Sequence, residues 1–294
     1  MGAQPSTEAV PKPAGLAILA GGGDFPLLVA EAAAAQGRDV LIFGITGEAS
    51  EGIAAFPHIW LGRGQLGRLF GGMRRQGIVD LVMIGGVRER RMPRFSEVDW
   101  GGLWGVIRNL GLLRRGDDSV LRFLARVIES RGFRVVGAAD VAPHLTIDAG
   151  LKTQAAPTAA DWHDIDIGLA AARAHGAMDR GQAVVARDGA VLMRETADGT
   201  DAMLAVVAAG TGSDRLARSG VLVKCLKPVQ DRRLDMPAIG METVRGAAAA
   251  GLCGIAVGAG ETLVADLPGV IAAADRLVLF VIGVEAMAAR PHEL

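Results

Sequence analysis

Leu16-Ala17-Ile18-Leu19-Ala20-Gly21-Gly22-Gly23 is the stretch that decides the fold of the N-terminal half. A short apolar run that stops at consecutive glycines is typical of a buried strand ending in a tight turn. Residues 26–36 then read as a helix, with Pro26 in its first turn and Gly37 directly after its end. A strand, a glycine turn and a helix in this order predict the first unit of a parallel α/β sheet.

The alternation of strands and helices continues through residue 138. We expect strands at 40–45, 58–61, 81–84 and 134–138, and helices at 66–76 and 117–131. Because most of these strands are continuous apolar runs, the sheet should be parallel and covered by helices on both faces. Residues 15–150 are therefore predicted to form a Rossmann-like domain, preceded by a disordered lead-in at 1–14.

The pattern changes in the C-terminal half. Residues 150–160 lack periodicity and read as a linker, followed by a helix at 161–175. Strands at 183–186 and 191–194 flank Asp188-Gly189, which is a hairpin signal. Further strands are expected at 221–224, 254–257, 262–265 and 277–282, with helices near 202–209, 241–250 and 269–274. A hairpin mixed with βα units predicts a second, mixed α/β (α+β) domain at 151–294, which we expect to be the catalytic one.

Composition excludes several classes of protein. The 294 residues contain 31 Lys and Arg against 32 Asp and Glu, a formal net charge of −1, which argues against a nucleic-acid partner. Mean hydropathy is +0.32, yet the longest uncharged stretch of the C-terminal half, 246–260, is too short for the ~20 residues of a membrane span. The N-terminus lacks a basic segment followed by an apolar core, so we expect neither a signal peptide nor an anchor.

Two glycine loops are candidates for binding an anion at strand ends. Gly22, Gly23 and Asp24 lie between a strand and a helix, but the dinucleotide fingerprint G-x-G-x-x-G fails because Pro26 occupies its sixth position. A phosphate-binding loop and a merely tight turn remain equal alternatives. Gly86 and Arg88 follow another strand, where they either bind an anionic ligand or form a solvated basic turn.

Carboxylates are concentrated where a strand of the second domain meets a helix. Glu195, Asp198 and Asp201 lie within seven residues, and Mg²⁺ coordination would use one or two of them. The alternative is structural, with Thr200 or Asp201 as the helix N-cap.

The strongest candidate is the polar segment from Lys224 to Gly240, which apolar runs frame on both sides. Two lysines and an arginine (Lys224, Lys227 and Arg232) can neutralise a diphosphate, while Asp231 and Asp235 can hold a metal or orient water. These residue types fit phosphoryl transfer to water, which needs positioning and charge neutralisation. No Gly-x-Ser-x-Gly motif is present, which disfavours an esterase.

The motifs together resemble the LpxI-type UDP-2,3-diacylglucosamine pyrophosphatases of Gram-negative lipid A synthesis. The resemblance covers nearly the whole chain beyond the lead-in, and its most specific part is the pattern Lys-x-x-Lys-Pro-x-Gln-Asp-x-Arg-x-Asp-x-Pro from Lys224 to Pro237. The other matching segments are 20–26, 85–87, 116–118, 181–185, 199–203 and 250–257.

The resemblance implies an activity, a cofactor and two α/β domains with the lipid product bound between them. The family hydrolyses UDP-2,3-diacylglucosamine to UMP and 2,3-diacylglucosamine 1-phosphate with Mg²⁺, and water attacks the sugar-side phosphorus. The family's essential aspartate matches Asp235. Relatives more often carry Glu at the position of Asp198, which puts a direct metal role for that residue in doubt.

Motif and resemblance together define the predicted site. Asp235 and Asp231 are expected to be catalytic, and Asp235 and Asp201 to bind the metal. The expected substrate-binding residues are Gly22, Gly23, Asp24, Gly86, Arg88, Gln182, Thr200, Asp201, Lys224, Lys227, Gln230, Arg232 and Thr243.

The expected location is the cytoplasm, with transient contact with the inner membrane, and a homodimer is left open. The stretch 100–113 is either an amphipathic piece that touches the membrane or acyl chains, or core packing.

Two other functions compete with this reading. A Rossmann oxidoreductase would bind NAD at the Gly21 loop, but Asp39, the acid nearest the required spacing, precedes a strand instead of ending one. A non-catalytic nucleotide- or lipid-binding protein would explain the basic loops but not the carboxylates beside them.

Overall fold

The structure, a computed structural model, describes residues 13–62, 64–87, 117–210, 218–228 and 230–285. Contacts divide the chain into two compact units. The N-terminal unit comprises Met1–Gly111 and Leu124–Val141, and the C-terminal unit comprises Leu112–Phe123 and Ala142–Leu294. Within the described ranges, no helix has both the length and the apolar character needed to cross a membrane.

The N-terminal unit contains a five-stranded, fully parallel sheet in the order β3-β2-β1-β4-β5. Its strands are β1 (Leu16–Ala20), β2 (Val40–Ile45), β3 (His58–Leu61), β4 (Asp80–Ile84) and β5 (Arg134–Val135). The helical elements are α1 (Phe25–Ala35), a 3₁₀ turn at Glu51–Ala55, α2 (Leu66–Arg75), the second half of α4 (Asp117–Glu129) and α5 (Ala138–Val141). This strand order, with β1 at the centre, confirms the prediction of a Rossmann-like sheet.

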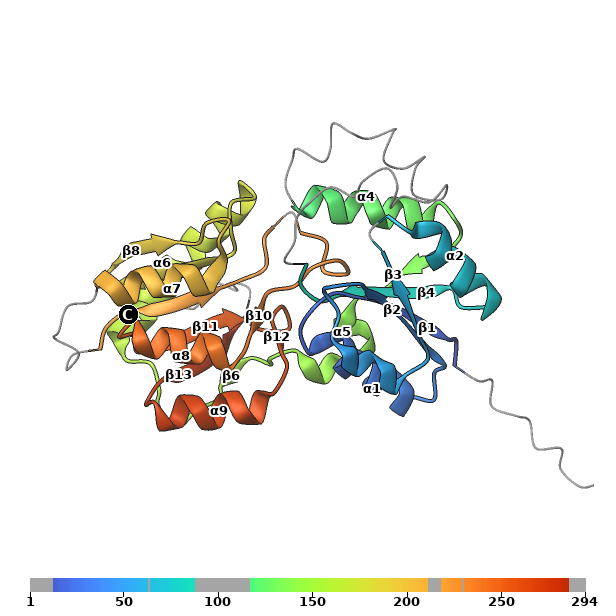
Figure 1. The fold of residues 1–294 in the computed structure, drawn as a ribbon. Coiled ribbons are helices and arrows are strands. Elements are labelled where there is room, and N and C mark those ends of the chain that lie inside the picture. The colour runs from blue at the N-terminus through green and yellow to red at the C-terminus, as the bar shows by residue number, and fades with distance from the viewer. Residues whose placement is uncertain (1–12, 63, 88–116, 211–217, 229, 286–294) are drawn as a thin grey trace, which may run out of the picture. The chain divides into compact units, whose positions relative to one another are not determined.

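The parallel sheet forms the buried centre of the N-terminal unit. Ile18 of β1 is fully buried and lies in register between Ile42 and Val82. Helices α1 and α5 cover one face and α2 covers the other (Figure 1). On the α2 side the approach is so close that a Cβ on Gly72 would lie 2.7 Å from the Phe43 ring.

The C-terminal unit contains a six-stranded mixed sheet in the order β6-β13-β11-β9-β7-β8. Its strands are β6 (Gly150–Leu151), β7 (Ala183–Arg187), β8 (Ala190–Arg194), β9 (Val221–Lys224), β11 (Gly254–Gly258) and β13 (Phe280–Val284). Strands β9, β11 and β13 are parallel, whereas β6, β7 and β8 each run antiparallel to their neighbours. Strands β10 (Ala238–Ile239) and β12 (Leu263–Val264) form a separate parallel pair.

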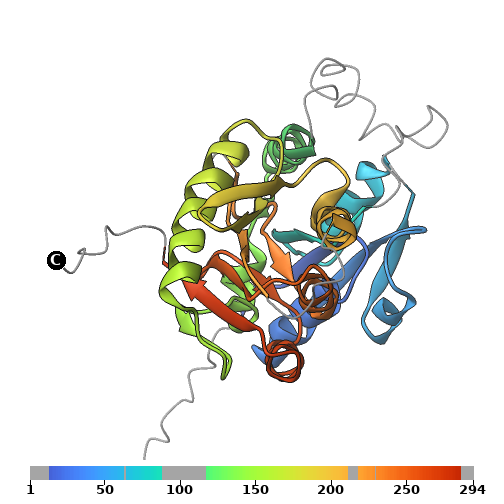
Figure 2. The same ribbon diagram turned by 90° about the vertical axis from the view of Figure 1, so that its left-hand side faces the viewer.

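Alternate residues of these strands fill two cores. Val184, Val223 and Ile282 pack with α6 (Ala159–Ala177) on one face. The neighbouring residues on the strands, such as Val185 and Leu222, pack on the opposite face. That face is covered by α7 (Gly199–Gly210), α8 (Met241–Ala249) and α9 (Leu267–Arg276), as Figure 2 shows. The mixed α/β character predicted for this half is confirmed.

The hairpin predicted at Asp188-Gly189 is confirmed. Strands β7 and β8 pair antiparallel, and both turn residues have positive φ, 53° at Asp188 and 76° at Gly189. Positive φ at both central residues is the geometry of a two-residue type I′ turn.

The structure corrects the predicted linker at 150–160. Its first two residues form β6, which pairs with β13, and its last two begin α6. Thr158 and Asp161 form a capping box at the start of that helix. This local helix signal was missed because the segment also contains glycine and proline.

Two predicted strands were also wrong in their bounds. The strand expected at 134–138 stops at Val135, because the Asp140 carboxylate accepts the Gly137 N–H (3.1 Å) as the chain turns into α5. The strand expected at 277–282 begins only at Phe280, because α9 extends to Arg276 and Val278 (φ 53°) then reverses the chain.

Candidate active site

The two glycine loops of the N-terminal unit are bonded to each other. The Gly22 N–H donates to the Gly86 carbonyl (2.7 Å), and the Gly86 N–H donates to the Gly22 carbonyl (3.0 Å). A Cβ on Gly21 would lie 2.6 Å from the carbonyl oxygens of both Gly85 and Gly86. The close approach of the loops that follow β1 and β4 therefore accounts for these glycines, and it uses two N–H groups that the sequence suggested for an anion.

The other predicted residues of this region are exposed or not described. Gly23 and Asp24 are exposed, and Asp24 is the N-cap residue of α1 without a side-chain hydrogen bond to the helix. Arg88, the stretch 100–113 and most of the lead-in lie outside the described residues.

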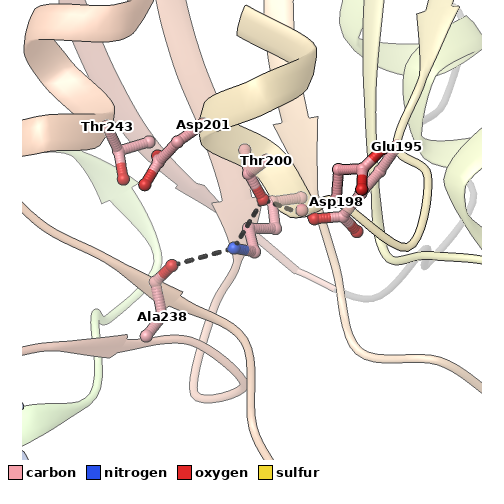
Figure 3. A pocket seen from close by; sticks show the side chains of 8 residues that line it. Glu195, Asp198, Thr200, Asp201, Ala238 and Thr243 are labelled. Atoms are coloured by element: carbon pink, nitrogen blue, oxygen red, sulfur yellow. Dashed lines mark hydrogen bonds between the residues drawn. The ribbon is translucent and has the colours of Figure 1, made fainter. Parts of the chain in front are cut away.

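The C-terminal unit has a polar pocket of ≈330 Å³. It is lined by Glu195, Asp198, Gly199, Thr200, Asp201, Lys224, Ala238 and Thr243. These residues come from the end of β8, the start of α7, the end of β9, β10 and the first turn of α8. Figure 3 shows Asp201 and Thr243 on one side of Thr200, with Glu195 and Asp198 on the other. The structure thus brings together four predicted substrate-binding residues from three segments of the chain: Thr200, Asp201, Lys224 and Thr243.

Lys224 is the buried cation of this pocket. It ends β9, a strand whose residues are all buried, and only 7% of it is exposed. Its Nζ donates to Thr200 Oγ1 and to the Ala238 carbonyl, each at 3.0 Å (Figure 3). Burial lowers the pKa of Lys224 from its ordinary value, and the charges of Glu195, Asp201 and Asp235 oppose that shift. The pocket therefore encloses an ammonium group among carboxylates.

Glu195 is the carboxylate most deeply enclosed, because it directly follows β8 and faces the start of β7. Its Oε2 accepts the backbone N–H groups of Gln182 (2.6 Å) and Ala183 (3.2 Å). Its Oε1 accepts the Thr200 hydroxyl (2.6 Å). The sequence drew attention to this carboxylate but gave it no place in the site. Its position was the available signal. Glu195 follows a strand of alternating exposed and less exposed residues and precedes the Gly199-Thr200-Asp201 sequence that begins α7.

Thr200 and Asp201 are not N-caps, so the structural alternative considered for them is wrong. Helix α7 begins at Gly199, which places both residues within its first turn. Thr200 is buried and directs its hydroxyl to Glu195, while Asp201 is exposed and lines the pocket.

Asp235 is held by the polar segment that follows β9. The Gln230 amide donates to the Asp235 carboxylate, and Gln230 accepts the Lys227 N–H through its own oxygen (3.2 Å). Gln230 is only 7% exposed, whereas Asp235 is exposed and its charge acts on Lys224. The buried Gln230 side chain therefore links the Lys227 backbone to Asp235 and orients the Asp235 carboxylate.

Four other predicted residues lie outside the pocket lining and are bonded to protein groups. The Lys227 ammonium pairs with Asp179 (2.8 Å), and Arg232 donates to the Gly260 carbonyl (2.6 Å). Arg233 binds Asp231 (2.7 Å), and its hydrogen bonds lower the pKa of that carboxyl. Gln182 contributes its backbone N–H to Glu195, while its buried side-chain oxygen has no hydrogen-bond partner among the residues that the structure describes.

The carboxylates at the pocket fit a divalent cation that takes most of its ligands from elsewhere. Mg²⁺ in phosphate chemistry is usually held by one or two carboxylates together with water and substrate phosphate. Asp198 and Asp201 are both exposed and line the pocket. Over the described part of the chain, no group of three or more His, Cys, Asp or Glu side chains is arranged to hold a metal alone.

Comparison with known proteins gives consistent matches to both halves of the chain. Residues 15–145 match the LpxI N-terminal domain, and residues 148–282 match the LpxI C-terminal domain. The chain is 38% identical over 278 residues to the UDP-2,3-diacylglucosamine pyrophosphatase LpxI of Caulobacter vibrioides, covering 92% of this chain and 97% of that protein. With its predicted fold confirmed and both domains matched, the chain belongs to the LpxI family.

Proposed function

We propose that this protein hydrolyses UDP-2,3-diacylglucosamine to UMP and 2,3-diacylglucosamine 1-phosphate in lipid A biosynthesis. The relative from Caulobacter vibrioides carries the name of this pyrophosphatase. The structural observation that carries the proposal is the buried Lys224 ammonium at the wall of a pocket lined by Asp198 and Asp201. A cation beside metal-binding oxygens is what a diphosphate requires.

Lys224 supplies a hydrogen-bond donor for the reacting phosphates. Among the described residues, its ammonium directs two of its three hydrogens to Thr200 and the Ala238 carbonyl. The third hydrogen can reach a phosphate oxygen in the pocket. Because Lys224 is shielded from water, its charge stabilises the negative charge that develops on phosphate oxygens more than an exposed lysine would.

Asp235 orients the attacking water. Its carboxylate, fixed by the Gln230 amide, accepts a hydrogen from water while the water oxygen bonds to phosphorus. The bond from that phosphorus to the bridging oxygen breaks, and the bridging oxygen leaves on the other phosphate. Asp231 is the second expected catalytic residue, although its carboxylate is bound to Arg233.

Asp201 and Asp235 are the proposed holders of Mg²⁺. Asp201 lines the pocket, as Asp198 does, and the charge of Asp235 acts on Lys224 at the pocket wall. Bound there, Mg²⁺ would neutralise phosphate charge and fix the orientation of the diphosphate. The pocket is polar, so it suits the diphosphate part of the substrate, and the acyl chains need an apolar surface elsewhere. Since the substrate is a lipid, we also propose transient contact with the cytoplasmic face of the inner membrane.

The test is the release of UMP from UDP-2,3-diacylglucosamine by the purified protein, with and without Mg²⁺. UMP and the lipid phosphate should appear in equal amounts, and removal of Mg²⁺ by EDTA should stop their release. Reaction in H₂¹⁸O identifies the phosphorus attacked, since ¹⁸O in the lipid phosphate means attack on the sugar side. Binding of the substrate without turnover would contradict the proposal and favour a binding protein, while NADH binding would favour an oxidoreductase.

A further inference from the structure

Glu195 is a buried carboxylate that the mechanism above does not use. Only 7% of the residue is exposed, although it borders the pocket. Its two carboxylate oxygens accept three hydrogen bonds from protein donors, two from the backbone at the start of β7 and one from Thr200. These donors already occupy both oxygens, so Glu195 is better suited to holding its neighbours than to ligating a cation.

The backbone of Glu195 is fixed as well as its side chain. Nε2 of the buried His175 ring lies 2.7 Å from the Glu195 carbonyl oxygen, so this nitrogen carries the hydrogen and donates it. The Glu195 N–H in turn donates to the Ala183 carbonyl (3.0 Å). Glu195 therefore links α6, β7 and α7 through hydrogen bonds at the wall of the pocket.

The direction of each hydrogen bond in this chain follows from counting hydrogens. A hydroxyl has a single hydrogen, and a carboxylate can only accept. Thr200 therefore donates its hydrogen to Glu195 (2.6 Å) and must use a lone pair to accept the Lys224 ammonium (3.0 Å). The carboxylate thus decides which way the Thr200 hydroxyl points, and that direction decides where a hydrogen of Lys224 is held.

We propose that Glu195 is a positioning residue, which orients the Thr200 hydroxyl and through it holds the Lys224 ammonium against the reacting diphosphate. The inference rests on the proposed function and adds a residue to it. Glu195 touches neither the substrate nor the metal in this proposal.

Glu195→Gln is the decisive substitution, because it preserves shape and reverses one hydrogen bond. If the new amide oxygen accepts the backbone N–H groups of Gln182 and Ala183, the amide NH₂ faces Thr200 as a donor. Thr200 has two lone pairs and can accept from both the amide and Lys224, but its own hydrogen then loses its acceptor. The direction of the hydroxyl, and with it the position of the Lys224 ammonium, is therefore no longer fixed. We expect kcat to fall about 10- to 100-fold while KM changes less than about threefold, since misplacement affects the transition state more than substrate binding.

Thr200 variants show whether Glu195 acts through the hydroxyl. Thr200→Val removes the hydroxyl and should lower kcat as much as Glu195→Gln does. The double variant should be no slower than the slower single variant, because both changes break the same chain. Thr200→Ser keeps the hydroxyl and should restore most of the activity that Thr200→Val loses.

Asp161→Asn is the matched control, since Asp161 is also 7% exposed and accepts the Thr158 backbone N–H (2.8 Å) at the start of α6. It should lower the thermal midpoint without changing kcat, and circular dichroism on every variant identifies those that are folded at the assay temperature. An active wild type with an equally active Glu195→Gln would overturn the inference alone, as would additive losses in the double variant. A wild type that releases no UMP would overturn the proposed function and the inference together.

Discussion

The glycine crossing of Gly21, Gly22, Gly85 and Gly86 and the polar pocket around Lys224 offer a comparison within one chain. Both were candidates for holding phosphate on the basis of sequence. In the crossing, the N–H groups of Gly22 and Gly86 are bonded to each other's carbonyls. In the pocket, a buried ammonium lies among lining carboxylates, and within the described part of the chain two of its three hydrogens are bonded. The comparison shows that a glycine loop is a poor candidate for binding phosphate when its N–H groups already donate hydrogen bonds to backbone carbonyls.

The largest effect that separates the two regions is expected for Asp235→Asn. The change removes the carboxylate that we propose orients water, so kcat should fall about 10²- to 10⁴-fold, the range typical of a general base. Because Asp235 is exposed, the thermal midpoint should change little. UMP release and thermal unfolding measure both quantities, and activity near that of the wild type would remove Asp235 from the mechanism.

Lys224→Met is expected to have the next largest effect. It replaces the ammonium by an apolar group of similar length, so kcat should fall about 10²- to 10³-fold through lost stabilisation of phosphate charge. The Ala238 carbonyl also loses its donor. Steady-state kinetics provides the measurement, and a change confined to KM would show that Lys224 only binds substrate.

Gly21→Ala tests whether the close approach at Gly21 is needed for the stability of the fold. The added Cβ would lie 2.6 Å from two carbonyl oxygens of the backbone, so we expect a loss of about 1–3 kcal/mol in the free energy of unfolding. Gly86→Ala is the matched control for stability, because its Cβ would meet no atom of the described residues within 4 Å. Urea unfolding compares the two, and equal stabilities would contradict the close approach described for Gly21.

The smallest effect is expected for Lys227→Met. Lys227 is paired with Asp179, and such partly exposed ion pairs contribute about 0–1 kcal/mol. Turnover should therefore fall less than about tenfold, well short of the loss for Lys224→Met. A loss as large as that for Lys224→Met would show that Lys227 leaves Asp179 to bind the diphosphate, as the sequence suggested.

The Rossmann-like half was the more predictable of the two, because local signals specify its elements. Apolar runs ending at glycine located β1 and β4, and the Asp188-Gly189 turn located the β7–β8 hairpin in the other half. Strand β6 was missed because its two residues are ordered by β13, about 130 positions later in the chain. No local pattern carries information about such a partner.

The sequence by itself determined the alternation of strands and helices, the family motifs and the residue types available for phosphate chemistry. These depend on interactions among neighbours in the chain, which composition and spacing record. Only the tertiary structure decided that Gly22 and Gly86 bond to each other, that Lys227 pairs with Asp179, and that Glu195, Thr200 and Lys224 form one chain of hydrogen bonds. These contacts join strands and helices distant in sequence, so the packing of the sheets decides which donors remain for a substrate.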